Sequence, residues 1–410
     1  MVRGPMISEP RIPLFRWPHG LGPISLILIT VAILFLRRPD QFLAPYVWVE
    51  DGSFVLREYL ENGWRTILYP LAGYLVISTK IISAASFKAS ILYAPQIAIV
   101  LTTLFTCGVV CAIAFSPTHL RCPVLCAFSV LLVPTDPEVF AVSLYAFWWA
   151  GILCLLAAMW DEDRDKVWLR YFFIILGGLS SPLAVSLAPV FILRAIVERK
   201  GWIAALIALL IGGIQARAML QARMGTSVSS LGPNTVPAAI QKLAADFLFN
   251  GAGLWIGIGL IAIYGAACIW NRKNFGWPFV VLLCIYGIVS ASVLLRLSYD
   301  TLLIIHKFVA GQRYFFYPFI VLGWLLIWIA AETNNFVRIA TALVFMVSII
   351  GAGWRLSSRH DHFSWRDQIL KCSTSDTYEL PIHYSGYTPN MWKVEMKGSE
   401  CRDLMHRSLF

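Results

Sequence analysis

Charged residues are scarce in this 410-residue chain, where Asp, Glu, Lys and Arg together make up only 14% of the sequence. Water-soluble domains carry about 25%. Hydrophobic residues reach 58% here, and the mean hydropathy is +0.70. Alternation of polar and apolar residues does not recur at the spacing of a membrane β-barrel. The composition therefore predicts an all-α, polytopic integral membrane protein surrounded by lipid.

Several motifs of nucleotide-binding and hydrolytic enzymes are also missing. The chain has no Walker A sequence, no Rossmann glycine pattern and no GxSxG element. Its net charge is +10, but no basic, aromatic-interleaved soluble segment carries that excess. We attribute the excess to loops that follow the positive-inside rule and to anionic lipid, and we expect no nucleic-acid partner.

Cysteines are few, and most of them lie in or near apolar runs, where thiols pack as small apolar groups. Only Cys372 and Cys401 stand in the polar tail of the chain. Two cysteines in such a tail predict a disulfide in an oxidising compartment. Neither the other cysteines nor the tail histidines have acidic or thiol neighbours at a metal-site spacing. We expect no cofactor, while a divalent metal ion stays an open alternative.

A bilayer needs roughly 20 apolar residues per crossing helix, and about eleven runs approach that length. They lie at 19–36, 89–115, 120–133, 139–160, 167–180, 182–197, 201–216, 251–270, 277–295, 314–331 and 336–354. Arginines directly follow the first run, which favours a retained helix over a cleaved signal peptide. The runs define a transmembrane domain over residues 19–354.

Basic residues in the short loops all fall on one side of this arrangement. They are Arg121, Arg164, Lys166, Arg194, Arg199, Lys200, Arg272, Lys273 and Arg338. The positive-inside rule places that side, together with residues 1–18, in the cytoplasm. Three longer loops then face the outside, at 37–88, 217–250 and 296–313. An odd number of helices sends the tail, 355–410, outside as well.

The segment Pro70 to Phe87 decides whether this orientation holds, because one more crossing there would invert every later loop. Lys80 in its middle, with polar residues on both sides, favours a helix lying at the membrane surface instead. The first outer loop would then hold interfacial helices.

Adjacent acids, Glu50 and Asp51, stand in this loop in the stretch YVWVEDGSFVLREYLENGW. The pattern predicts a helix with Asp51 or Ser53 at its N-cap, and an ion pair between Arg57 and Glu61. A carboxylate at the positive end of a helix dipole stays ionised, and it can accept a proton from a hydroxyl group. The plainer interpretation is that Asp51 only caps the helix.

The stretch VEDGSFVLREYLENGWRTILYPLAGYL resembles a signature of bacterial membrane proteins in the GT-C superfamily of glycosyltransferases. GLSSPLAVSLAPVFILR, GQRYFFYP and LPIHYSGYTPNMW also resemble segments of that group. Where the signature often continues with a histidine and an arginine, this chain has VISTK, Val76 to Lys80. The resemblance implies transfer of a sugar from a polyprenyl-phosphate donor to a glycan or lipid acceptor. It also implies the outer face of a bacterial inner membrane, and a role in building envelope glycans such as lipopolysaccharide.

Such a transfer needs a base for the acceptor hydroxyl and cations for the departing phosphate. We predict Asp51 as the general base, with Glu50 orienting it or binding sugar hydroxyls. The candidate phosphate ligands are Arg296, His306, Lys307 and Arg313, and their alternative role is ordinary anchoring at the membrane interface. Candidate substrate-binding residues are Tyr74, Asp136, Arg217 and Arg223.

Other functions remain open at this point. A transporter or flippase of lipid-linked glycans would place charged residues deep inside its helices, and most runs here contain none. A non-catalytic protein of envelope assembly would tolerate the loss of Asp51. A polymerase or an acyltransferase would keep an outer-face site with different chemistry, and His306 would be the only histidine placed to act as the acyltransferase's base.

Overall fold

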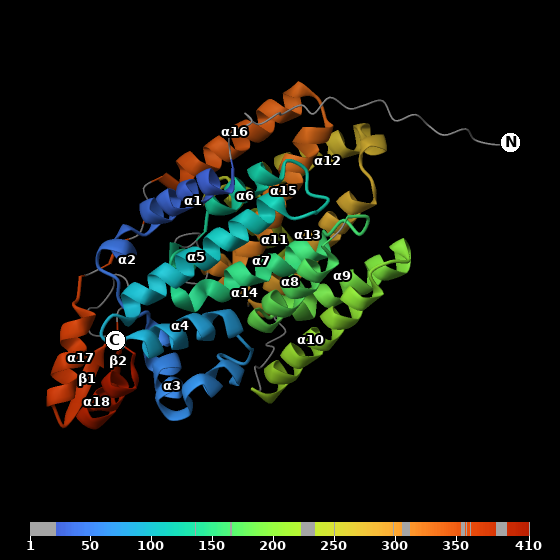
Figure 1. Ribbon diagram of the computed structural model, residues 1–410. Coiled ribbons are helices and arrows are strands. Elements are labelled where there is room, and N and C mark those ends of the chain that lie inside the picture. Colours follow the sequence, from blue (N-terminus) through green and yellow to red (C-terminus); the bar gives the residue numbers. More distant parts are fainter. Residues whose placement is uncertain are drawn as a thin grey trace.

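The protein is predominantly helical, as its composition predicts (Figure 1). The structure is a computed structural model. It describes residues 22–409 apart from 136, 165, 223–233, 250, 298, 306–311, 354–356, 358, 361 and 383–391.

Each predicted apolar run contains a helix of the structure. The helices are α1 (Pro23–Arg37), α5 (Ala94–Phe115), α6 (Pro123–Leu131), α7 (Ala146–Ala158), α8 (Val167–Ser180), α9 (Leu183–Glu198), α10 (Trp202–Gln221), α12 (Leu254–Trp270), α13 (Trp277–Arg296), α15 (Phe316–Glu332) and α16 (Asn335–Ala352). Among the described residues, five helical segments are long and apolar enough to cross a membrane: α5, α10, α13, α16, and Arg313–Glu332, which includes α15. The other helices are shorter, so eleven crossings remain a prediction.

The centre of the bundle is formed by α7 and α15. Every residue of α7 is buried, and α15 is buried along most of its length. By contrast, α12 buries only Gly257 and Tyr264 and exposes large apolar side chains such as Trp255 and Ile261. Buried helices surrounded by helices with apolar outer faces are the arrangement expected of a bundle in lipid.

The basic loops gather at one end of the bundle. Arg121, between α5 and α6, lies 2.8 Å from the carboxylate of Glu332 at the end of α15. The carboxylate of Glu198, at the end of α9, accepts a hydrogen bond of 2.8 Å from the indole of Trp277 at the start of α13. Because α15 begins next to Arg313 and ends at Glu332, Arg313 lies at the opposite end of the bundle.

The loop 37–88 is folded and packed onto this opposite end. It contains α2 (Pro39–Leu43), a π-helical turn (Asp51–Val55), α3 (Leu56–Asn62), a 3-10 helix (Gly63–Leu68) and α4 (Ile77–Ala89). The expected surface helix around Lys80 corresponds to α4, but Lys80 is fully buried there and its ammonium group donates to Glu58 and to the Tyr69 carbonyl. The polar residue that favoured a membrane-surface helix is therefore used inside the protein.

The other two long loops of the predicted arrangement hold short helices. In 217–250 the structure has α11 (Thr235–Leu243) and a 3-10 turn (Ala245–Phe247), and in 296–313 it has α14 (Tyr299–Ile304). Further 3-10 turns are Pro137–Val139, Ser143–Tyr145, Arg272–Asn274 and Gln312–Phe315. Helix α10 continues to Gln221, past residue 217, where the second loop is predicted to begin.

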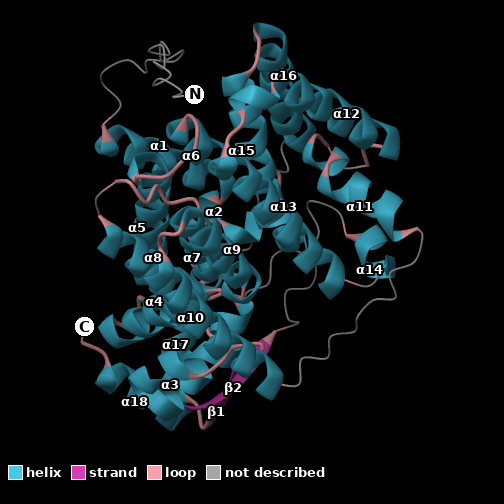
Figure 2. Ribbon diagram, turned by 90° about the vertical axis from the view of Figure 1, so that its right-hand side faces the viewer, coloured by secondary structure: helices cyan, strands magenta, loops and turns pink. Residues whose placement is uncertain are grey.

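The tail forms a small unit beside α3 (Figures 1 and 2). It consists of α17 (Trp365–Thr374), β1 (Thr377–Pro381), β2 (Lys393–Lys397) and α18 (Gly398–Arg407). The strands pair antiparallel, with Tyr378 opposite Met396. A disulfide joins Cys372 to Cys401, the pair that the sequence singles out.

Candidate active site

Asp51 is buried where three segments of the chain meet. Its Oδ1 accepts a hydrogen bond of 2.9 Å from Ser83 on α4, and its Oδ2 accepts bonds from the Ser143 hydroxyl (2.6 Å) and the Leu144 backbone N–H (3.0 Å). Only 2% of the residue is exposed. The expected N-cap role is wrong: Asp51 is the first residue of the π-helical turn, and its carboxylate binds segments distant in sequence instead of the N–H groups of the helix that follows.

This environment changes the acidity of Asp51. Burial raises the pKa of its carboxyl group to about 6, and the neighbouring charge of Glu50 acts in the same direction. The hydrogen bonds from Ser143, Ser83 and Leu144 oppose the rise. The sequence predicted an ionised carboxylate at the positive end of a helix dipole. In the structure, loss of hydration raises the pKa more than the hydrogen bonds lower it, and the carboxylate is still mostly ionised at neutral pH.

The surroundings of Glu50 differ from those of Asp51, because two charged residues lie near it. Burial raises the pKa of Glu50, the positive charge of Arg313 lowers it, and the negative charge of Glu138 raises it. Glu50 therefore lies near Arg313 and Glu138, whereas the carboxylate of Asp51 points towards Ser83 and Ser143. Adjacent residues of a helical turn diverge in this way, so the two acids serve different surroundings.

Arg313, Glu138 and Tyr145 are hydrogen-bonded to one another. The Arg313 guanidinium donates to Glu138 Oε2 (2.8 Å) and to the Tyr145 hydroxyl (2.9 Å), and that hydroxyl donates to the same Glu138 oxygen (3.0 Å). The guanidinium also lies over the ring of Tyr145, with 5.4 Å from its central carbon to the ring centroid. Arg313 was predicted to belong to the site, but Glu138 was not, although it follows Asp136 by two residues in the same proline-bounded turn.

Arg296 approaches the same region from the end of α13. Its guanidinium carbon lies 5.1 Å from the ring centroid of Tyr314, and that of Arg313 lies 6.0 Å from the same centroid. Arg296 also lies close enough to Tyr74 for its charge to act on the hydroxyl of that residue. Burial raises the pKa of Tyr74, while the charges of both arginines oppose that rise. Two cations and two tyrosines thus converge, and one of the cations, Arg313, lies near Glu50.

An aromatic wall continues from this group towards the bundle. The ring centroids of Trp148 and Tyr314 are 6.4 Å apart, those of Trp148 and Tyr317 are 5.0 Å apart, and those of Tyr74 and Phe147 are 5.7 Å apart. Rings of this kind can pack against a sugar or an isoprenoid chain through their faces while their hydroxyl groups bind polar atoms.

Of the other predicted residues, the structure describes Arg217, which is not brought into this group. Arg217 is exposed on α10, and the neighbouring Gln215 makes the contact with loop 37–88 instead, by hydrogen bonds to both the N–H and the carbonyl of Leu75. Asp136, Arg223, His306 and Lys307 lie outside the described residues.

The tail histidines have a structural partner. The backbone N–H of His360 donates to Asp40 Oδ2 (2.8 Å), and His362 Nε2 lies 3.1 Å from Asp40 Oδ1. These contacts fix the tail to α2. Within the described part of the chain, no group of three or more His, Cys, Asp or Glu residues is arranged to hold a metal ion.

The chain matches no protein-family model, no curated protein and no solved structure. The site combines a buried carboxylate whose pKa is about 6, a second acid near Arg313, and an adjoining wall of aromatic rings.

Proposed function

We propose that this protein is a membrane glycosyltransferase of the GT-C type, which moves a sugar from a polyprenyl-phosphate donor to a glycan or lipid acceptor. The reaction would take place on the extracytoplasmic face of a bacterial inner membrane. The observation that supports this most is the position of Asp51, buried next to the Glu50, Arg313 and Glu138 group at the bundle end opposite the basic loops.

Asp51 has the properties of a general base. A pKa of about 6 leaves it mostly ionised near neutral pH and still able to take up a proton from an attacking hydroxyl group. Two serine hydroxyls already donate to it, so an acceptor hydroxyl would occupy the place of Ser83 or Ser143. Direct displacement with inversion requires a single carboxylate base, which leaves Glu50 free to bind sugar hydroxyls.

Arg313 and Arg296 would take the departing lipid phosphate. Both guanidinium groups flank Tyr314, and charge-assisted hydrogen bonds to a phosphate strengthen as negative charge develops on the leaving oxygen. Glu138 and Tyr145 hold Arg313 in place before the donor binds. The rings of Trp148 and Tyr314 would contact the sugar or the first isoprene units.

The proposal is tested by transfer of radiolabelled sugar from a panel of polyprenyl-phosphate donors, using the purified full-length protein and its Asp51→Asn variant. Asparagine keeps the size of the side chain but cannot act as a base. Glu61→Gln is the matched control, because Glu61 is an exposed acid of the same loop.

Transfer by the wild type and by Glu61→Gln that collapses in Asp51→Asn would support the assignment. Equal transfer by all three proteins would move the base to Glu50, which Glu50→Gln then tests. No transfer by the wild type with any donor would overturn the proposed function.

A further inference from the structure

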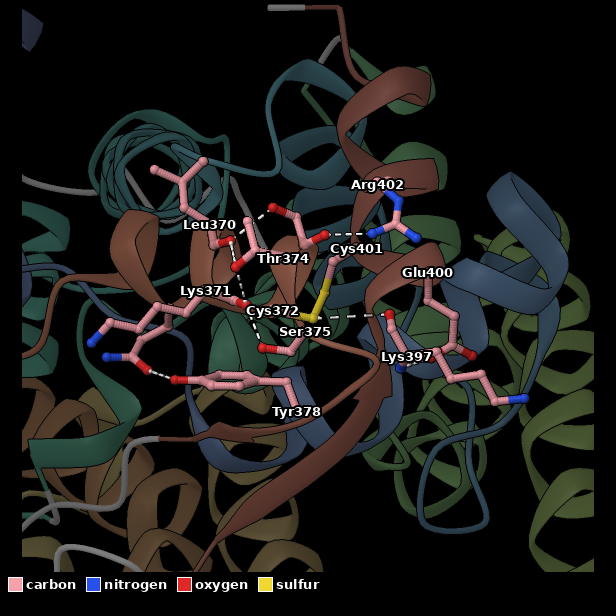
Figure 3. Close-up of a disulfide and its surroundings, with 12 residues drawn as sticks. Leu370, Lys371, Cys372, Thr374, Ser375, Tyr378, Lys397, Glu400, Cys401 and Arg402 are labelled. Carbon is pink, nitrogen blue, oxygen red and sulfur yellow. Dashed lines mark hydrogen bonds between the residues drawn. A yellow bond between two sulfur atoms is a disulfide. The ribbon is translucent and has the colours of Figure 1, made fainter.

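The tail is a small folded unit that contains its own disulfide. Cys372 on α17 is bonded to Cys401 on α18, so the helices on either side of the β1–β2 hairpin are covalently joined (Figure 3). The Tyr378 hydroxyl of β1 donates to Gln368 on α17 (2.6 Å). The hairpin is therefore held against both helices.

This unit contacts the segment carrying Glu50 and Asp51 on both sides of the two acids. Before them, the Tyr46 hydroxyl donates to the Pro381 carbonyl at the end of β1 (2.6 Å). After them, Arg57 forms an ion pair of 3.0 Å with Glu400 and donates to the Glu395 carbonyl (2.6 Å). The expected partner of Arg57 was Glu61, and the tail supplies a different one.

Between these two contacts, Ile382 of the tail lies directly on Gly52, the residue after Asp51. A Cβ atom placed on Gly52 would be 2.4 Å from Ile382 Cδ1 and 2.9 Å from Cγ1. Real Cβ atoms do not approach other carbons that closely, so Gly52 is needed here for space, not for backbone conformation. Ile382 is itself buried, which limits its room to move aside.

The tail also reaches α4, the helix that supplies Ser83 to Asp51. The ammonium group of Lys88 donates to the Arg407 carbonyl (2.7 Å), and the Leu409 N–H donates to the carbonyls of Lys88 and Ala89. One unit thus contacts both the turn that begins with Asp51 and the helix that binds its carboxylate.

We propose that the disulfide-bonded tail positions the Asp51 carboxylate, and that Ile382 is the positioning residue that presses the Asp51–Gly52 turn against α4 and Ser143. This inference rests on the proposed function, because it assigns the tail a role in aligning that base. Ile382 does not contact substrate in this scheme; it acts through Gly52.

Positioning by Ile382 has a consequence beyond fold stability. Ile382 covers the turn and so helps to exclude water from Asp51, whose raised pKa comes mainly from burial. The ionisable group whose charge acts on Asp51 is Glu50, and Glu50 in turn lies near Arg313 and Glu138. Shortening Ile382 leaves those charges unchanged and lets water in. It should therefore move the acid limb of the pH–rate profile to lower pH.

A size exchange between the two residues tests the contact. Gly52→Ala alone should reduce kcat on the order of 10²-fold, because catalysis is that sensitive to a displacement of about 1 Å. Adding Ile382→Ala removes the clash, so the double variant should recover most of that loss. Ile382→Val should keep a kcat and a pH–rate profile close to those of the wild type. Ile382→Ala should shift the acid limb of the profile to lower pH. A double variant no better than Gly52→Ala, or an unchanged acid limb in Ile382→Ala, would overturn the inference.

Hydrogen exchange followed by mass spectrometry gives a readout that needs no transfer activity. Peptides covering residues 46–58 of the full-length protein should exchange faster in Ile382→Ala, and faster in the wild type after reduction of Cys372–Cys401. If the wild type shows this exchange pattern but transfers no sugar, the proposed function is overturned and the positioning contact is still supported. If the protein transfers sugar but neither Ile382→Ala nor reduction changes the exchange of these peptides, only the positioning role is overturned.

Discussion

Arg313 and Glu138 form an ion pair of 2.8 Å although 175 residues separate them in the chain. The pair joins the start of the central helix α15 to the turn that precedes α7. Tyr145 completes it by bonding to both partners. The charges of both partners act on Glu50, so the pair is coupled to the candidate active site.

We predict that Arg313→Ala lowers transfer about 10²- to 10³-fold, the range for removing one donor that stabilises developing charge. The transfer rate of Arg313→Lys should lie between those of the wild type and Arg313→Ala. Lysine keeps the charge, but it lacks the planar fork that can bind phosphate and Glu138 together. The measurement is kcat and KM for the lipid-linked donor. Arg217→Ala, an exposed arginine outside the group, serves as the control. Equal rates for Arg313→Ala and Arg217→Ala would contradict the assignment.

The raised pKa of Asp51 predicts a pH-dependent stability. The folded-state pKa of about 6 lies above the ordinary value of 3.8. Between these two values the unfolded chain has lost the proton that the folded protein keeps. The stability linked to this group is therefore fully present below about pH 4 and is lost as the pH rises through about 6.

Asp51→Asn lacks this titration. Relative to the variant, the wild type should lose on the order of 3 kcal/mol between about pH 4 and pH 7. Thermal unfolding of both proteins in detergent across that range measures the difference, with Glu61→Gln as an exposed-acid control that should follow the wild type. Parallel stability curves for wild type and Asp51→Asn would show that Asp51 titrates normally.

The sequence located the helices because apolar runs of membrane length have few alternative structures. It also marked Asp51, Arg313 and the two tail cysteines, which stand out as rare residue types in their surroundings. The sequence could not identify the residues that bind the Asp51 carboxylate. Ser83 and Ser143 carry no pattern that connects them to Asp51, and their contact exists only after α4 and the segment before α7 have packed.

The wrong expectations share one physical cause. Arg57 was paired with Glu61, and Asp51 or Ser53 was expected to cap the helix, because local rules consider only neighbours in sequence. In the structure both side chains use tertiary partners, Glu400 for Arg57 and Ser83 and Ser143 for Asp51. The partner of Lys80 was not predicted either, because Glu58 lies one helix earlier.

Lys80 and Glu58 provide a last prediction, which concerns stability alone. The Lys80 side chain is fully buried, its ammonium group lies 2.5 Å from Glu58 Oε2, and it donates to the Tyr69 carbonyl. Glu58 is 27% exposed and also accepts from Thr66. The two charges are thus unequally placed: Glu58 can reach water, and Lys80 cannot.

Removing either partner should therefore have unequal effects. Glu58→Gln leaves a buried ammonium group without its counter-charge and should cost about 3 kcal/mol of unfolding free energy. Lys80→Met removes the buried charge and leaves Glu58 able to turn to solvent, so its cost should be clearly smaller. The double variant should resemble Lys80→Met, because no buried charge remains in it. Denaturant titration of the four proteins completes the double-mutant cycle. Costs that simply add, or a larger loss in Lys80→Met than in Glu58→Gln, would show that burial of Lys80 does not control the stability of this pair.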